Sequence, residues 1–306
     1  MHRRFLLALL LLVLFTAPAP AWWVKGHMAI TEAAAMNLPE DMPAFFRAAG
    51  KQLAYMAGDP DRWKNPDTKH LKAAEAPEHF LDSEDYDGND WPEDRYKAAR
   101  LLAGKLRKSP ERTGMLPYSL MENFEKLSVA FYDYRQVLAK EKTLIEMGDK
   151  ATDAEKKACE AEKRAIEMKC IVYAGVLSHY TGDTAMPLHT TIHYDGKKGD
   201  DGKLKQRGIH AKIDGYPENN NFQPEEIARG LKAKDLPDAW KQIRESIEES
   251  FKHVDRCYDL DAGGAIDKPT PESREFIMSR CKVGAQFTMD MWYAAWKKSE
   301  KLPPSY

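Results

Sequence analysis

The sequence has little of what marks a β-protein, a membrane protein or a strongly basic nucleic-acid binder. Strand-like alternation is almost absent, and no internal repeat or low-complexity tract divides the chain. Beyond residue 21 no apolar run is long enough to cross a bilayer. With 46 Lys and Arg against 48 Asp and Glu, the chain is not globally cationic. Binding of a polyanion must therefore depend on a local positive site, and bound metal ions are one way to form such a site.

The one long apolar run lies at the N-terminus and predicts a signal peptide. Arg3 and Arg4 precede an apolar segment over residues 5–15, and Ala-Pro-Ala at 19–21 matches a cleavage site. We expect cleavage after Ala21, so that the mature chain begins at Trp22 and is secreted or periplasmic. Its formal net charge then changes from -2 to about -4.

Cysteine is scarce, with only four residues. In an exported chain this number predicts two disulfides. Cys159 and Cys170 fall in one predicted helix and lie about 16 Å apart along its axis, beyond disulfide reach. We therefore expect them to pair with Cys257 and Cys281. Both pairings stay open, as do free thiols.

Nearly every periodic segment after residue 21 has the spacing of apolar residues that is typical of a helix. The sequence predicts an all-α fold with one domain over residues 22–306, in which two irregular segments, 58–91 and 190–221, carry much of the polar chemistry. The predicted helices are 28–38, 42–57, 92–108, 118–147, a long helix opened by the capping box at 152–155, 237–260 and 270–299.

The stretch 178–189 carries three potential metal ligands at the end of a predicted helix. If residues 172–183 are helical, the apolar stripe of Val172 and Val176 continues into His179 and Asp183. Pro187 ends the helix, so His189 can approach from another direction. A histidine and a carboxylate one turn apart can hold one cation.

The other distinctive histidines complete an ordered pattern that resembles the zinc-dependent single-strand nucleases and 3′-nucleotidases, which share a superfamily with bacterial zinc phospholipases C. The motifs are Trp-x4-His (Trp22, His27), Asp-x2-Arg (Asp59, Arg62), His-Phe-x-Asp (His79, Phe80, Asp82), His-x3-Asp-x5-His (His179, Asp183, His189) and His-x3-Asp (His210, Asp214). Each motif is weak alone, and their order carries the resemblance.

The resemblance implies a helical bundle of the phospholipase C and zinc nuclease type, holding three zinc ions. The first zinc would be bound by Asp59, His79, His179 and Asp183. The second would be bound by His189, His210 and Asp214. The third would be bound by the free amine and carbonyl of Trp22, by His27 and by Asp183 as a bridge. Signal cleavage would expose that amine.

The implied activity is that of a secreted phosphodiesterase in which a zinc-activated water attacks phosphorus. Three divalent ions against three carboxylates leave about three positive charges, which suits a phosphoester anion. Arg62 would brace the phosphoryl group, Asp59 would also orient the water, and Phe80 would stack on a base or pack a lipid glycerol.

Two departures from the nuclease pattern keep the substrate open. A Gly-Gly-Asn run is expected after His189 and a tryptophan before Asp214, whereas the chain has Thr-Thr-Ile at 190–192 and Ile213. The partners are therefore single-stranded nucleic acid or nucleotides, with phospholipid head groups of a phospholipase C as the alternative. A zinc-binding module without turnover is a third hypothesis, and no protein partner is implied.

A run of basic residues over 197–207 is interleaved with Asp200 and Asp201. We favour a solvated loop. The alternative is a contact with a phosphate backbone beside the zinc site.

Overall fold

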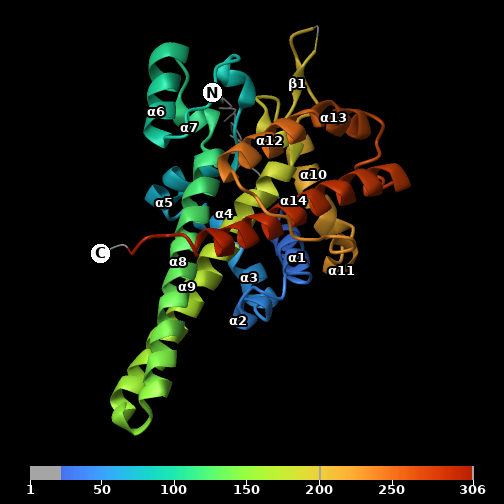
Figure 1. Cartoon of the computed structure of the whole chain (residues 1–306). Helices are drawn as coiled ribbons and strands as arrows, with labels where there is room; N and C mark the ends of the chain where they lie inside the picture. Colours follow the sequence, from blue (N-terminus) through green and yellow to red (C-terminus); the bar gives the residue numbers. More distant parts are fainter. Residues whose placement is uncertain (1–21, 200, 305–306) are drawn as a thin grey trace, which may run out of the picture.

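The computed structural model describes residues 22–199 and 201–304, and the predicted signal peptide lies outside this part of the chain. The all-α prediction is confirmed: within the described ranges the only sheet consists of two strands of two residues each (Figure 1). Within the same ranges, no helix combines the length and the apolarity that a bilayer crossing needs.

The α-helices, in chain order, are α1 (Val24–Ala35), α2 (Ala44–Arg47), α3 (Gly50–Met56), α4 (Asp59–Trp63), α5 (Lys69–Glu75), α6 (Arg95–Arg100), α7 (Pro110–Thr113), α8 (Leu116–Met147), α9 (Asp153–Ala185), α10 (Ile209–Asn219), α11 (Pro224–Ile227), α12 (Ala239–Phe251), α13 (Val254–Ala262) and α14 (Pro271–Lys298). Shorter helical turns are η1 (Ala76–His79), η2 (Ser83–Tyr86), η3 (Leu101–Leu106), η4 (Gly148–Lys150) and η5 (Pro187–Thr190). Strand β1 (Lys197–Lys198) pairs antiparallel with β2 (Leu204–Lys205).

The two long helices α8 and α9 form an antiparallel hairpin that organises the molecule (Figure 1). A capping box between Thr152 and Glu155 starts α9. The first half of α9 is largely exposed and bonded to α8 by ion pairs such as Lys140–Glu162 and Lys163–Glu141. From residue 174 to residue 185 every residue of α9 is buried, because α1, α3 and α14 pack around it. The end of α9 therefore lies in the core.

Glycines at two points of α9 allow this close packing. Gly175 lies against α3, where a side chain would collide with Met56 and the carbonyl of Leu53. At Gly182 a Cβ would lie 2.9 Å from Nδ1 of His27 on α1. The lack of a side chain at these two positions lets α1 and α3 reach the backbone of α9.

Two segments expected to be irregular contain short helices. Residues 58–91 hold α4, α5, η1 and η2, and residues 190–221 hold α10. Most of these elements have only four to seven residues, too few for a helical period to show. The predicted helix 237–260 is divided into α12 and α13.

The predicted disulfides are not formed, because all four cysteines are free and buried. Cys159 lies in the half of the α8–α9 hairpin that projects from the body, with its Sγ 4.0 Å from the carbonyl of Val137 on α8. Cys257 is on α13, which lies at the other end of the molecule (Figure 1). Helical spacing excludes pairing within α9, but it says nothing about which neighbour each cysteine faces.

Candidate metal centre

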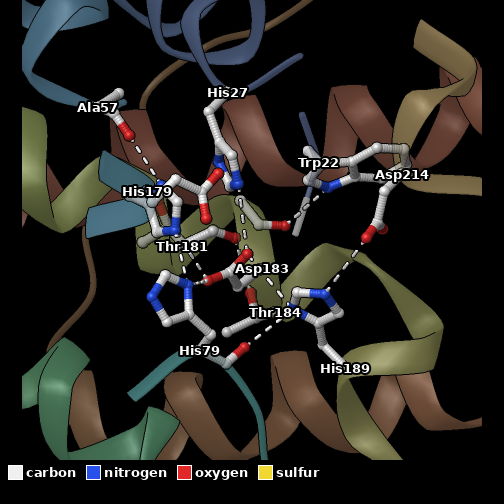
Figure 2. Close-up of polar contacts among 12 residues, drawn as sticks. Trp22, His27, Ala57, His79, His179, Thr181, Asp183, Thr184, His189 and Asp214 are labelled. Carbon is white, nitrogen blue, oxygen red and sulfur yellow. Dashed lines mark hydrogen bonds and ion pairs between the residues drawn. The ribbon is translucent and has the colours of Figure 1, made fainter. Parts of the chain in front are cut away.

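Histidines and aspartates from five elements converge at the buried end of α9 (Figure 2). Helix α9 contributes His179 and Asp183, and η5 contributes His189 after the break at Pro187. The remaining side chains are His27 from α1, His79 from η1, and His210 and Asp214 from α10. All are buried except His210, which is partly exposed.

Asp183 lies at the centre of the first four histidines. Its Oδ1 is 3.4 Å from Nε2 of His27 and 3.3 Å from Nδ1 of His189. Its Oδ2 is 3.2 Å from Nδ1 of His79 and 3.3 Å from Nε2 of His179. Each oxygen thus faces a different pair of histidines.

A second cluster adjoins the first through His189. Its Nε2 lies 3.0 Å from Nε2 of His210, which is 2.9 Å from Oδ2 of Asp214. Two imidazole nitrogens this close share either a proton or a cation. The spacing predicted for the His-x3-Asp pair therefore does place both side chains beside His189.

Backbone carbonyls orient two of the rings. Nδ1 of His179 is 2.8 Å from the carbonyl oxygen of Ala57, and Nδ1 of His189 is 2.8 Å from that of His79. Since a carbonyl only accepts, each Nδ1 carries the proton and each Nε2 keeps a lone pair. On the far side of His79, its Nε2 lies 3.5 Å from Oε1 of Glu75. Such partners commonly fix metal-binding imidazoles.

Several buried polar atoms at this place have no hydrogen-bond partner in the described structure. They include both ring nitrogens of His27, Oδ1 of Asp183 and Oδ1 of Asp214. A buried polar atom without a partner costs free energy. Cations bound among these atoms would remove that cost, so the residues present fit metal ions.

The ligand atoms form three groups, each with all its atoms within 4.8 Å of one another: His27, Asp61 and His179; His79, His179 and Asp183; and His189, His210 and Asp214. His179 belongs to two groups. Because its Nδ1 faces the carbonyl of Ala57, only Nε2 is free, and it can serve one ion. Buried His and Asp groups that can bind metal are thus present, and the first two groups share one ligand.

Asp61, which was not predicted, lies in the site, whereas the structure does not bring Asp59 and Arg62 to it. Asp59 belongs to none of the three groups, and its Oδ1 accepts a 2.7 Å hydrogen bond from Arg62. Arg62 also donates to the carbonyl of Tyr55 and stacks on its ring. The Asp61 side chain is only 3% exposed and pairs with Lys64 at 2.7 Å.

The helical geometry of α4 explains this exchange. Residues two apart on a helix point to nearly opposite sides, so Asp61 faces the core when Asp59 faces out. Asp61 and Lys64 repeat the spacing of Asp59 and Arg62. The sequence therefore contains the Asp-x2-basic pattern twice, two residues apart. In the structure the second pair, Asp61 and Lys64, is the one that lies at the site.

Trp22 lies beside the cluster. Its buried indole donates a 3.1 Å hydrogen bond to the carbonyl of Gly182, the residue before Asp183. The backbone N–H of Trp23 donates to the carbonyl of Asp214 at 3.2 Å. Residues 22 and 23 thus lie against Gly182 and Asp214, and ligation by the Trp22 amine stays a prediction.

No family model and no curated protein matches this chain. The resemblance to zinc nucleases therefore rests on the order of the motifs alone.

A cavity of about 540 Å³ adjoins the candidate metal ligands. His79, His189 and His210 form part of its wall, and the wall also includes Lys64, Ala76, Phe80, Asp82, Glu111, Arg112, Leu188 and Tyr194. This volume is in the range of small-molecule sites. Phe80, predicted to contact substrate, does line the cavity.

Burial and charge set the protonation of the ligands. Burial and the neighbouring His179 lower the pKa of His27 to about 4, so its ring is neutral at physiological pH, as metal binding requires. Burial alone would raise the pKa of Asp183, but His179 and His189 hold it well below its ordinary value. Burial raises the pKa of Asp214 despite His210.

Asp82 provides a prediction on pH. Burial, with Asp85 and Glu84 nearby, raises its pKa from 3.8 to about 7. The folded state therefore holds a proton that the unfolded state releases, so wild type loses stability as pH rises from about 4 to about 7. We expect Asp82→Asn to be more stable than wild type above pH 7 by more than about 1 kcal/mol, with the difference closing near pH 4. Urea unfolding with chelator present measures it, and a pH-independent difference would contradict it.

Proposed function

We propose that the chain is a secreted zinc-dependent phosphodiesterase of the nuclease or 3′-nucleotidase type. One observation carries the proposal: three adjoining groups hold buried, partly unpartnered ligand atoms, and histidines of two of these groups line a cavity. Histidine nitrogen and aspartate oxygen without thiolate suit zinc at a catalytic site. Bound there, zinc would lower the pKa of water and polarise a phosphoryl oxygen.

The ligand assignment that we propose follows the contacts. One ion is held by the group His79, His179 and Asp183. Asp61, whose group with His27 and His179 shares His179, takes the place expected for Asp59 beside this ion. A second ion is held by the group His189, His210 and Asp214. A third is held by His27 with Asp183 and the amine of Trp22, since His179 has no second lone pair to offer.

Secretion is part of this proposal. If cleavage follows Ala21, the new amine appears on Trp22, whose side chain is already fixed against Gly182. The amine would therefore form next to His27 and Asp183. Signal cleavage would then complete the third ligand set.

The cavity favours an anionic substrate with a flat ring. Lys64 and Arg112 balance Asp82 and Glu111 in its wall, so bound cations would make the wall positive, and Phe80 contributes an aromatic face on which a base can stack. The ring of Tyr194 also lines it, next to His210. A nucleotide meets these requirements with its phosphate towards the histidines and its base towards Phe80.

The test is metal content and turnover of the mature chain. We expect bound zinc by elemental analysis and chelator-sensitive cleavage of single-stranded DNA or a 3′-nucleotide. Cleavage of phosphatidylcholine vesicles alone would favour a phospholipase C and defeat the nuclease. Full zinc loading without turnover on any of the three substrates would favour a non-catalytic zinc-binding module.

Lys64 takes the place in this site that was expected for Arg62. Its Nζ pairs with Asp61, and its side chain, 16% exposed, lines the cavity beside three histidines. A cation between a metal ligand and the cavity can bind a phosphoryl oxygen as it gains charge. Arg62 cannot do this from its position against Asp59 and Tyr55.

We expect Lys64→Gln to lower kcat/KM on a nucleotide substrate by about a hundredfold. Zinc content should stay unchanged, and Lys64→Arg should recover part of the rate because the charge is kept. Arg62→Gln is the matched control and should stay within about threefold of wild type. Equal losses in both variants, or zinc loss in Lys64→Gln, would contradict the assigned role.

A further inference from the structure

A short β-hairpin lies between the two histidines of the His189–His210–Asp214 group. Strands β1 and β2 pair antiparallel, with Lys197 opposite Lys205, and the hairpin projects from the body at the top of Figure 1. His189 precedes it and His210 follows it in the chain. Because Tyr194 and His210 line the cavity, the hairpin leaves the body at the cavity wall.

Both arms of the hairpin are fixed at their base. The N–H of Gly196 donates to the hydroxyl of Tyr258 at 2.8 Å, and Nε2 of Gln206 donates to the carbonyl of Tyr258 at 2.8 Å. The N–H of Gly208 donates to Oδ1 of Asp195 at 2.7 Å. These bonds hold the start and the end of the hairpin in place relative to the cavity.

The hairpin is basic. The segment 197–207 has five basic residues against two acidic ones. Lys197 pairs with Asp255 and lies over the ring of Tyr258. The other four cations are exposed, and among residues 22–199 and 201–304 no carboxylate forms an ion pair with them: Lys198, Lys203, Lys205 and Arg207.

We infer that these four side chains bind the phosphate backbone of single-stranded nucleic acid that extends beyond the nucleotide in the cavity. The inference rests on the proposed function and names its substrate class, a polymer in preference to a mononucleotide. Exposed cations attract a strand through its phosphates, and the strand stays single because its base must leave the stack to reach Phe80.

The apolar content of the hairpin favours a polyanion over a membrane. Leu204 is its one large apolar side chain, at 50% exposure. Binding in a membrane interface requires a larger apolar face, buried below the head groups. Four exposed cations around one leucine instead suit a flexible chain of phosphates.

The test compares a quadruple variant with a matched control. The variant is Lys198→Gln, Lys203→Gln, Lys205→Gln and Arg207→Gln. The control removes four exposed lysines from the distant α8–α9 hairpin and has the same net charge: Lys142→Gln, Lys150→Gln, Lys156→Gln and Lys157→Gln. For each zinc-loaded protein, kcat/KM is measured on a thymidine dinucleotide and on an oligonucleotide of about twelve residues, across a range of salt.

We expect the hairpin variant to lose about tenfold on the long substrate at low salt, and the slope of log kcat/KM against log salt to fall by about 3. The dinucleotide rate should not change, which also shows that the variant is folded. The control should match wild type on both substrates, since the free end of the α8–α9 hairpin and strand β1 lie at opposite ends of the molecule (Figure 1).

Other outcomes overturn the inference. It is wrong if the long substrate is unaffected, if both substrates lose rate equally, or if the control loses as much as the variant. It is also wrong if only binding to phosphatidylserine vesicles is lost. Failure of wild type to cleave either substrate would instead contradict the proposed function, and fluorescence anisotropy with the same oligonucleotide would still decide whether the hairpin binds it.

Discussion

Asp183→Asn is expected to lower phosphodiesterase activity by about a thousandfold and to release more than one metal ion per chain. The reason is the position of this carboxylate, whose two oxygens lie 3.2–3.4 Å from nitrogens of four histidines. An amide keeps one acceptor oxygen but presents N–H groups to the other pair, where a cation needs a lone pair. Elemental analysis and initial rates on single-stranded DNA measure both effects.

His27→Ala is the comparison for this prediction. His27 contributes to one ligand set, so its loss should release a single ion and cost less activity than Asp183→Asn. If the two variants lose the same activity and the same amount of metal, Asp183 does not bridge. Circular dichroism of both variants establishes that the helices are intact.

Asp61→Asn is expected to lose activity by about a hundredfold or more and to weaken zinc binding, whereas Asp59→Asn stays within about threefold of wild type. The pair is matched in chemistry and in helix, because both residues lie in α4 two positions apart. Asp61 is buried within 4.8 Å of His27 and His179, while Asp59 is bonded to Arg62. Zinc affinity by competition with a chelating dye separates the two.

The opposite result would support Asp59 as the zinc ligand, as the sequence motif indicates. Loss of zinc in Asp59→Asn with normal binding in Asp61→Asn would mean that α4 turns when metal binds. The role assigned to Lys64 would then pass back to Arg62, because each cation accompanies its own aspartate.

The fold could be predicted from the sequence where helices are long. The helix predicted over 118–147 is found as Leu116–Met147, and the capping box at Thr152 marks the start of α9. The division between α12 and α13 was missed because apolar residues continue in helical spacing across it. A period shows which face is buried, but it does not show a short break in the backbone.

The part of the site that could be predicted from the sequence is the part set by local helix geometry. Ligands at fixed helical spacing, such as His179 with Asp183 and His210 with Asp214, are fixed by local geometry and do lie together. The choice between Asp59 and Asp61 depends on which side of α4 meets α9, and no local pattern contains that information. The prediction of two disulfides was wrong for the same reason, because tertiary packing decides which cysteines distant in sequence come close together.

The glycine at position 182 has a consequence for how this centre can vary. A single methyl group there would enter the space of the His27 ring, 2.9 Å from Nδ1, and push α1 away from the centre. Trp22, bonded to the carbonyl of the same residue, would be displaced with it. An uncharged, non-ligating position in the last turn of α9 thus constrains the candidate metal centre, and we expect Gly182→Ala to displace His27 from it.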